Sequence, residues 1–280
     1  LAPQEVEQLI TYPLEQAVKT IPKVIELRSI SRFGLSVVTV VFKDDVDIYW
    51  AREQIFQRLK QAEENIPKYA GSPELGPIST GLGEIYQYDV YAKKGYEDKY
   101  SATDLRTLQD WLVRTQLAGT VGVAEVSGWG GFVKQYEVAI NPERLRSMNL
   151  TLTDIFDALE RNNENTGSAY IDKKPTAYFI RGIGLVKSLE DIEKIVVKSN
   201  SSGIPVLIRD IASVQYGNST RYGAMVIDTT EAVGGVVMML KGANANEVTK
   251  NVETRIETIQ KSLPDGVKIE PFLNRSDLVG

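Results

Sequence analysis

The stretch GPISTGLGEIYQYDV, Gly76 to Val90, changes character halfway along. Its first half is small and polar, whereas its second half alternates as a half-buried strand does. Because side chains of a strand alternate between two faces, one face of this strand is expected to carry Glu84, Tyr86, Tyr88 and Val90. A phosphate-binding loop is excluded, because GPISTGLGE enters a strand and contains no Lys.

Outward from this stretch, the same alternation of helices and strands recurs. Apolar residues at helical spacing predict helices over residues 3–19 (with a kink at Pro13), 48–65, 102–118 and 244–262. Strand patterns cover residues 26–33, 35–42, 72–76, 84–92, 123–130, 132–140, 222–229, 233–240 and 267–273. This recurrence predicts an α+β fold of two ferredoxin-like, split β-α-β layers, with helices on one face of a mainly antiparallel sheet.

The middle of the chain, residues 151–216, differs from these repeats. A capped helix, TLTDIFDALERN, precedes the hairpin-like stretch SAYIDKKPTAYFIRG. A short helix near 189–194 and further strand patterns follow. We expect a smaller α+β subdomain inserted between two halves of the second layer.

Composition excludes several classes of function. The 280 residues include no Cys and no His, which excludes thiolate nucleophiles, Ser–His catalysis, disulfides and the usual zinc or copper ligands within this chain. Since no supported pair of nucleophile and base remains, the chain is not expected to be an enzyme. A net charge of −5 with both signs interspersed speaks against a nucleic-acid surface. Any bound metal must use carboxylates, carbonyls or Met sulfur.

Candidate metal ligands are therefore few. Glu84 begins its strand, where it either sits exposed at the strand end or lines a cleft as a carboxylate ligand. Met238 and Met239 are adjacent on one strand and point to opposite faces, so they cannot grip one ion together. Met225 on a neighbouring strand could join one of them as a soft-metal relay, with core packing as the alternative.

Two further features have ordinary explanations. In the acidic turn, Asp47 is expected to cap the helix that begins at Ile48, while Asp44 and Asp45 stay solvated. The tryptophans Trp50, Trp111 and Trp129 are expected to pack or to form interfaces, because no basic groove accompanies them.

Several long stretches resemble the heavy-metal efflux (Cus/Czc-type) branch of the resistance–nodulation–division (RND) transporters. They include QEVEQLITYPLEQA, RSISRFGLSVVTVVF, DIYWAREQIFQRL, ELGPISTGLGEIYQY, LRTLQDWLVR, GGVVMMLKGANANEV and LPDGVKIEPFLNRSDLV. The resemblance covers nearly the whole chain in order. It implies the first periplasmic loop of a bacterial inner-membrane protein that exports heavy-metal cations, driven by protons.

The resemblance also implies a division into subdomains. Residues 1–79 would form the first porter subdomain without its leading strand, and 80–150 with 221–274 the second. Residues 151–220 would be half of a docking subdomain, and 275–280 the lead-in to a membrane helix. In some zinc-type relatives an acid at the position of Glu84 is a metal ligand.

Partners follow from the same resemblance: a homotrimer, a periplasmic adaptor protein and an outer-membrane channel protein, with no cofactor and only the transported divalent or monovalent metal ion. No apolar run reaches the roughly 18 residues of a membrane helix, and the chain opens without Met, so we expect a piece of a longer protein. The alternative is a stand-alone extracytoplasmic binding or scaffold module.

Overall fold

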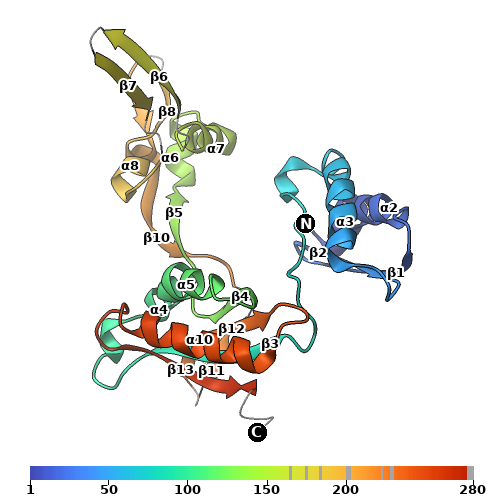
Figure 1. Cartoon of the computed structure of the whole chain (residues 1–280). Coiled ribbons are helices and arrows are strands. Elements are labelled where there is room, and N and C mark those ends of the chain that lie inside the picture. The colour runs from blue at the N-terminus through green and yellow to red at the C-terminus, as the bar shows by residue number, and fades with distance from the viewer. Residues whose placement is uncertain are drawn as a thin grey trace. The chain divides into compact units, whose positions relative to one another are not determined.

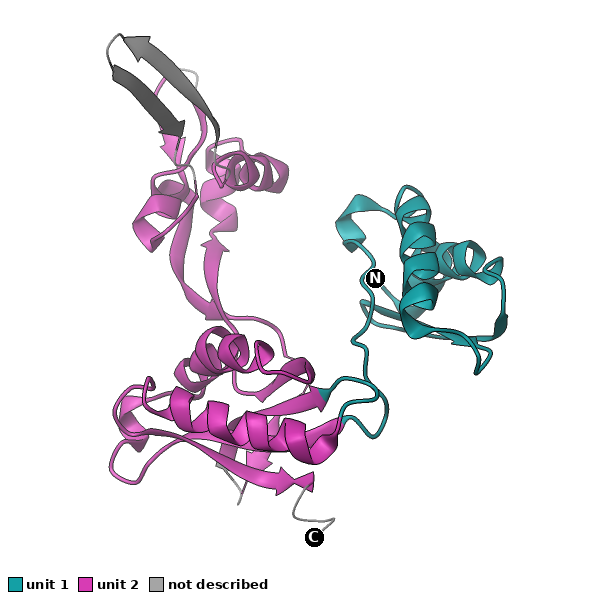
Figure 2. Cartoon of the chain, in the orientation of Figure 1, with its two compact units in different colours: residues 1–83, 239–243 teal, residues 84–238, 244–280 magenta. Residues whose placement is uncertain are grey.

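The computed structural model describes residues 1–163, 166–173, 176–182, 185–199, 203–221, 223–227 and 230–275. The chain forms two compact units, each described by itself below (Figures 1 and 2). Unit 1 comprises Leu1–Gly83 with Met239–Ala243, and unit 2 comprises Glu84–Met238 with Asn244–Gly280. Every strand ladder whose register is described is antiparallel, and the predicted α+β class is confirmed.

Unit 1 packs helices on a two-stranded sheet. Its elements are α1 (Pro3–Val6), η1 (Glu7–Thr11), α2 (Tyr12–Lys19), β1 (Val24–Arg32), β2 (Leu35–Phe42), α3 (Ile48–Glu63) and η2 (Lys68–Ala70). The first three form the predicted helix over 3–19. Its π-helical segment ends two residues before Pro13, whose missing amide N–H removes one helical hydrogen bond. Gly34 turns the β1–β2 hairpin with φ +65°.

The core of unit 1 joins α2 to α3 and to Val38 of β2. Leu14, Ala62 and Ile66 are buried together. Thr11 is also buried, and its hydroxyl lies 2.8 Å from Ser31 Oγ and 2.7 Å from Ser36 Oγ, which ties the helix to both strands. The strand expected over 72–76 is wrong, because these residues form no ladder in the structure.

Unit 2 contains a sheet in which β12 pairs with β3, β4 and β11, and β3 also pairs with β13. Its members are β3 (Glu84–Ala92), β4 (Val123–Gly130), β11 (Met225–Ile227), β12 (Thr230–Met239) and β13 (Val267–Asn274). The helices are α4 (Ala102–Leu108), η4 (Gln109–Val113), α5 (Arg114–Ala118) and α10 (Ala245–Gln260), with the short η3 at Glu97–Lys99. The order β4–β12–β3–β13 is that of a split β-α-β layer.

Helices cover one face of this sheet (Figure 1). Apolar residues of α10 recur at helical spacing, and Val248, Val252, Ile256 and Ile259 are buried. From β3, Tyr88 and Val90 are fully buried. Burying a side chain of this size stabilises the fold by about 1.5–3 kcal/mol.

The remaining elements of unit 2 have a core of their own. They are β5 (Lys134–Ile140), α6 (Pro142–Ser147), α7 (Leu152–Arg161), β6 (Thr166–Lys173), β7 (Thr176–Gly182), α8 (Leu189–Glu193), β8 (Val196–Ser199), β9 (Pro205–Leu207), α9 (Ile208–Ile211) and β10 (Ala212–Asn218). Ile155, Ile192 and Ile208 are among the buried residues of this core. Strands β6 and β7 form the predicted hairpin, whose turn residues 174–175 lie outside the described residues, as do 276–280.

Candidate functional site

The surroundings of Glu84 depend on an irregularity in the ladder between β3 and β12. Val237 lies opposite Tyr86, and the next residue of β12, Met238, lies opposite Glu84. Ile85 is therefore one extra residue in β3, a β-bulge, which reverses the alternation of side chains beyond it. In agreement with this, Ile85 and Tyr86 are both buried, at 0% and 3% exposure.

Because of the bulge, the prediction that Glu84 shares a face with Tyr86, Tyr88 and Val90 is wrong. Tyr86, Tyr88 and Val90 do share the face covered by helices, but Glu84 does not lie with them. Glu84 is exposed, and its Oε2 accepts a hydrogen bond from Gln87 Nε2 at 3.3 Å. Gln87 points to the face that the helices leave uncovered, so a carboxylate stands there rather than against the helices.

We call this second surface of the sheet the open face and define it by seven residues. They are Glu84, Gln87 and Asp89 of β3, Gly234 and Met238 of β12, and Lys268 and Glu270 of β13. Residues directly opposite each other in an antiparallel ladder point to the same face. Met238 is opposite Glu84, while Gly234 and Glu270 flank Asp89 from either side.

Met225 also reaches the open face. It lies opposite Ala232 in the ladder between β11 and β12. Its Sδ lies 2.8 Å from the position that a Cβ of Gly234 would occupy, so the thioether covers that glycine. From Gly234 to Met238 the strand advances four residues, about 13 Å, so the two methionine positions are too far apart to hold one ion together.

Two acidic residues on the open face, Asp89 and Glu270, were missed by the sequence analysis. Asp89 is half-buried, and burial raises the pKa of its carboxyl group, with the charge of Glu270 acting in the same direction. Glu270 accepts a hydrogen bond from Tyr91 Oη at 2.6 Å and lies 3.4 Å from Lys268 Nζ. These two contacts lower the pKa of Glu270, so its charge is compensated. The alternating polar positions of EIYQYDV were the available signal.

The open face offers oxygen and sulfur ligands in pairs. Within the described part of the chain, no group of three or more His, Cys, Asp or Glu residues could hold a metal ion. Glu84 with Met238, at one end of the face, and Asp89 with Met225, further along it, each present one carboxylate and one thioether. Such a surface can supply part of a coordination shell.

Two other residues singled out from the sequence, Asp47 and Trp50, have structural roles. Asp47 caps α3, accepting hydrogen bonds from the amides of Tyr49 and Trp50 at 3.0 and 2.9 Å, as predicted. Trp50 packs edge-on against Phe42, with ring centroids 6.4 Å apart. Trp111 is 80% exposed and lines a hollow in unit 2.

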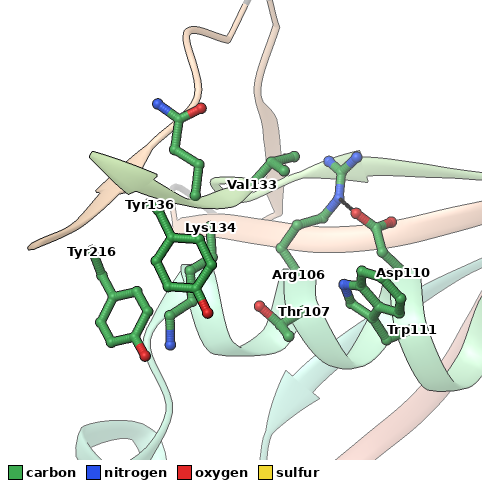
Figure 3. Close-up of a pocket in the computed structure, with 9 residues that line it drawn as sticks. Arg106, Thr107, Asp110, Trp111, Val133, Lys134, Tyr136 and Tyr216 are labelled. Carbon is green, nitrogen blue, oxygen red and sulfur yellow. Dashed lines mark hydrogen bonds and ion pairs between the residues drawn. The ribbon is translucent and has the colours of Figure 1, made fainter. Parts of the chain in front are cut away.

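That hollow, of about 280 Å³, lies between α4–η4 and the strands β5 and β10 (Figure 3). On its floor, Arg106 Nε lies 2.7 Å from Asp110 Oδ2, and Arg106 Nη1 donates to the carbonyl of Gly130 at 2.7 Å. Lys134 Nζ lies 4.1 Å from the centre of the Tyr216 ring, a cation–π contact. Among the described residues that line this hollow, Asp110 alone carries a carboxylate.

A hollow of about 570 Å³ in unit 1 has walls that are polar and apolar in about equal measure. It lies between β2, the helices α2 and α3, and the extended residues 70–77. Arg52 of α3 contacts the extended segment 70–77. Its Nη1 donates a hydrogen bond to the carbonyl oxygen of Gly76 at 2.6 Å. Val38, Val40 and Phe42 of β2 face it, so the core of unit 1 is open on this side.

Comparison with known proteins places the chain in a family. The family model described as AcrB/AcrD/AcrF family matches residues 1–280. The chain belongs to the AcrB/AcrD/AcrF family. The predicted resemblance to its heavy-metal efflux branch is confirmed by the relatives described next.

Within the AcrB/AcrD/AcrF family, the chain is 45% identical over 282 residues to the cation efflux system protein CzcA of Alcaligenes sp. (strain CT14). It is 40% identical over 280 residues to the cation efflux system protein CusA of Escherichia coli (strain K12). The alignments cover 99% of this chain and 26% of each relative, so the chain spans about a quarter of their length.

A solved structure agrees with this assignment. The crystal structure of a heavy metal efflux pump (crystal form II) superposes with a TM-score of 0.87 at 33% identity, covering 100% of this chain and 27% of that one. These AcrB/AcrD/AcrF-type relatives are named as efflux systems and pumps rather than enzymes. Among the described residues, no helix is both long and apolar enough to span a bilayer.

Proposed function

We propose that this chain is the periplasmic part of a proton-driven heavy-metal cation efflux pump and forms one wall of the cation path. The observation that carries the proposal is the open face, where the bulge at Ile85 presents Glu84 directly opposite Met238. Carboxylate and thioether ligands together suit borderline and soft metal ions. Relatives named for cation efflux and for cobalt, zinc and cadmium resistance support the same substrate class.

In this proposal the chain supplies ligands but not the driving force. Glu84 and Met238 offer two ligands, and the remaining ones come from parts of the longer protein outside residues 1–280. Proton flow through that longer protein moves the β-α-β layers against one another, so that the open face is alternately closed and released.

The proposed assembly is a homotrimer in the bacterial inner membrane, working with a periplasmic adaptor protein and an outer-membrane channel protein. The subdomain around residues 151–220, with its separate core, is the proposed docking surface. The 26% share of the relatives' length supports one part of this proposal, that the chain belongs to a larger protein.

The hollow in unit 1 is the proposed place of the leading strand. A strand from outside residues 1–280 would pair with the free edge of β2 and cover Val38, Val40 and Phe42.

The test is metal resistance in a strain that lacks the full-length gene and is complemented with variants. Glu84→Gln should lower resistance to zinc, cobalt or cadmium, while the matched control Glu97→Gln should not. Glu97 is a suitable control because it is exposed and bonds only the amide of Gly95 among the described contacts. Equal resistance in both variants would count against the open face. No loss of resistance on deleting the gene would favour the stand-alone binding or scaffold module.

A further inference from the structure

Asp89 and Met225 converge on the open face although they come from distant parts of the chain. Asp89 lies directly opposite Gly234, and opposite residues place their Cβ atoms about 4.5–5.5 Å apart. The missing side chain of Gly234 leaves a gap that Met225 fills, with its Sδ 2.8 Å from the vacant Cβ position. The sulfur therefore lies within about 8 Å of the Asp89 Cβ, close enough for both side chains to contact one ion.

In the part of the chain that the structure describes, the carboxylate of Asp89 forms no ion pair, and the charge of Lys268 offsets only part of the cost of its burial. Among the described residues it accepts a hydrogen bond only from its own backbone amide, and it is half-buried. Its neighbour Glu270 is instead held by Tyr91 and Lys268. A half-buried carboxylate without a directly paired counter-charge is costly, and a bound cation would reduce this cost.

We infer that Asp89 and Met225 form a binding site for a divalent cation of borderline to soft character, with water in its remaining positions. One oxygen and one sulfur ligand favour ions such as Cd²⁺ over Mg²⁺, which demands an oxygen shell. They also disfavour Cu⁺, which prefers several soft ligands. This site rests on the proposed function, because it adds a second cation-binding position on the open face. That position lies about 13 Å along the strand from Met238.

The experiment is a titration of the chain with Cd²⁺ alone, combined with X-ray absorption at the cadmium edge. The wild-type chain should show a sulfur shell around cadmium, which Met225→Leu abolishes at nearly constant side-chain volume. Asp89→Asn should weaken binding by about tenfold or more, since even outer-shell changes cost about 10–100-fold. Met148→Leu and Glu97→Gln, at exposed positions, are the matched controls.

Two results would overturn the site. One is an unchanged cadmium affinity in both Asp89→Asn and Met225→Leu, and the other is displacement of cadmium by an equal concentration of Mg²⁺. Circular dichroism of each variant verifies its fold. Resistance of cells carrying the full-length variants separates the two proposals: cadmium bound at Asp89 without any effect on resistance would keep the site and contradict the proposed function.

Discussion

Replacing Gly235 with alanine tests the buried polar contact that holds η4 on the sheet of unit 2. Tyr88 and Gln109 are both fully buried, and Tyr88 Oη donates to Gln109 Oε1 at 3.0 Å. A Cβ at Gly235 would collide with the Tyr88 hydroxyl and lie 2.5 Å from Tyr88 Cζ and 2.9 Å from Gln109 Nε2. One added methyl group must therefore push this pair apart.

The expected cost follows from three contributions. Overpacking a core costs about 1–3 kcal/mol, and loss of the Tyr88–Gln109 hydrogen bond costs about 1 kcal/mol more. The reduced freedom of the unfolded chain offsets about 0.4–1 kcal/mol of this. Gly235→Ala should therefore lower the free energy of unfolding of unit 2 by about 1–3.5 kcal/mol, or about 2–14 °C in Tm.

The assay is urea unfolding followed by fluorescence of Trp111 and Trp129, both in unit 2. The Trp50→Phe background removes the signal of unit 1. Gly223→Ala is the control within unit 2, because no atom lies within 4 Å of its added Cβ, and its effect should stay within about 0.5 kcal/mol. Equal unfolding midpoints for Gly235→Ala and Gly223→Ala would refute the reasoning.

Three further expectations concern caps, ion pairs and pH. Asp47→Ala should destabilise unit 1 by about 1 kcal/mol through loss of the α3 cap, whereas Asp44→Ala should be nearly neutral in urea unfolding. Asp110→Asn should cost more than Glu190→Gln, since both belong to i,i+4 ion pairs but the side chain of Asp110 is 22% exposed and that of Glu190 75%. Because the pKa of Asp89 is raised in the folded state, stability should fall as pH rises from below the ordinary value of 3.8 through the folded-state pKa. Asp89→Asn should abolish this fall in stability. An unchanged pH profile in this variant would contradict the assignment of the raised pKa to Asp89.

Local sequence patterns were sufficient to predict most helices and the β1–β2 hairpin of unit 1. Apolar spacing predicted α3 and α10, and the side chains of Asp47 and Ser101 mark the starts of α3 and α4. These features depend on neighbours within one or two helical turns, so the residues of each segment carry them. The prediction of a strand over residues 72–76 was wrong because a strand forms only when another strand pairs with it, and that pairing is not a local property of the segment.

The candidate site shows the same division. Glu84, Met225 and Met238 could be chosen from their chemistry alone, because a chain without Cys and His leaves few metal ligands. Their position on one face of the sheet could not be predicted, since the bulge at Ile85 arises from pairing with β12, far along the chain. The closeness of Asp89 to Met225 likewise depends on three strands meeting in one register. Residue type and periodicity are local, whereas register is set by long-range backbone pairing, and a one-residue change in it moves a side chain to the other face of the sheet.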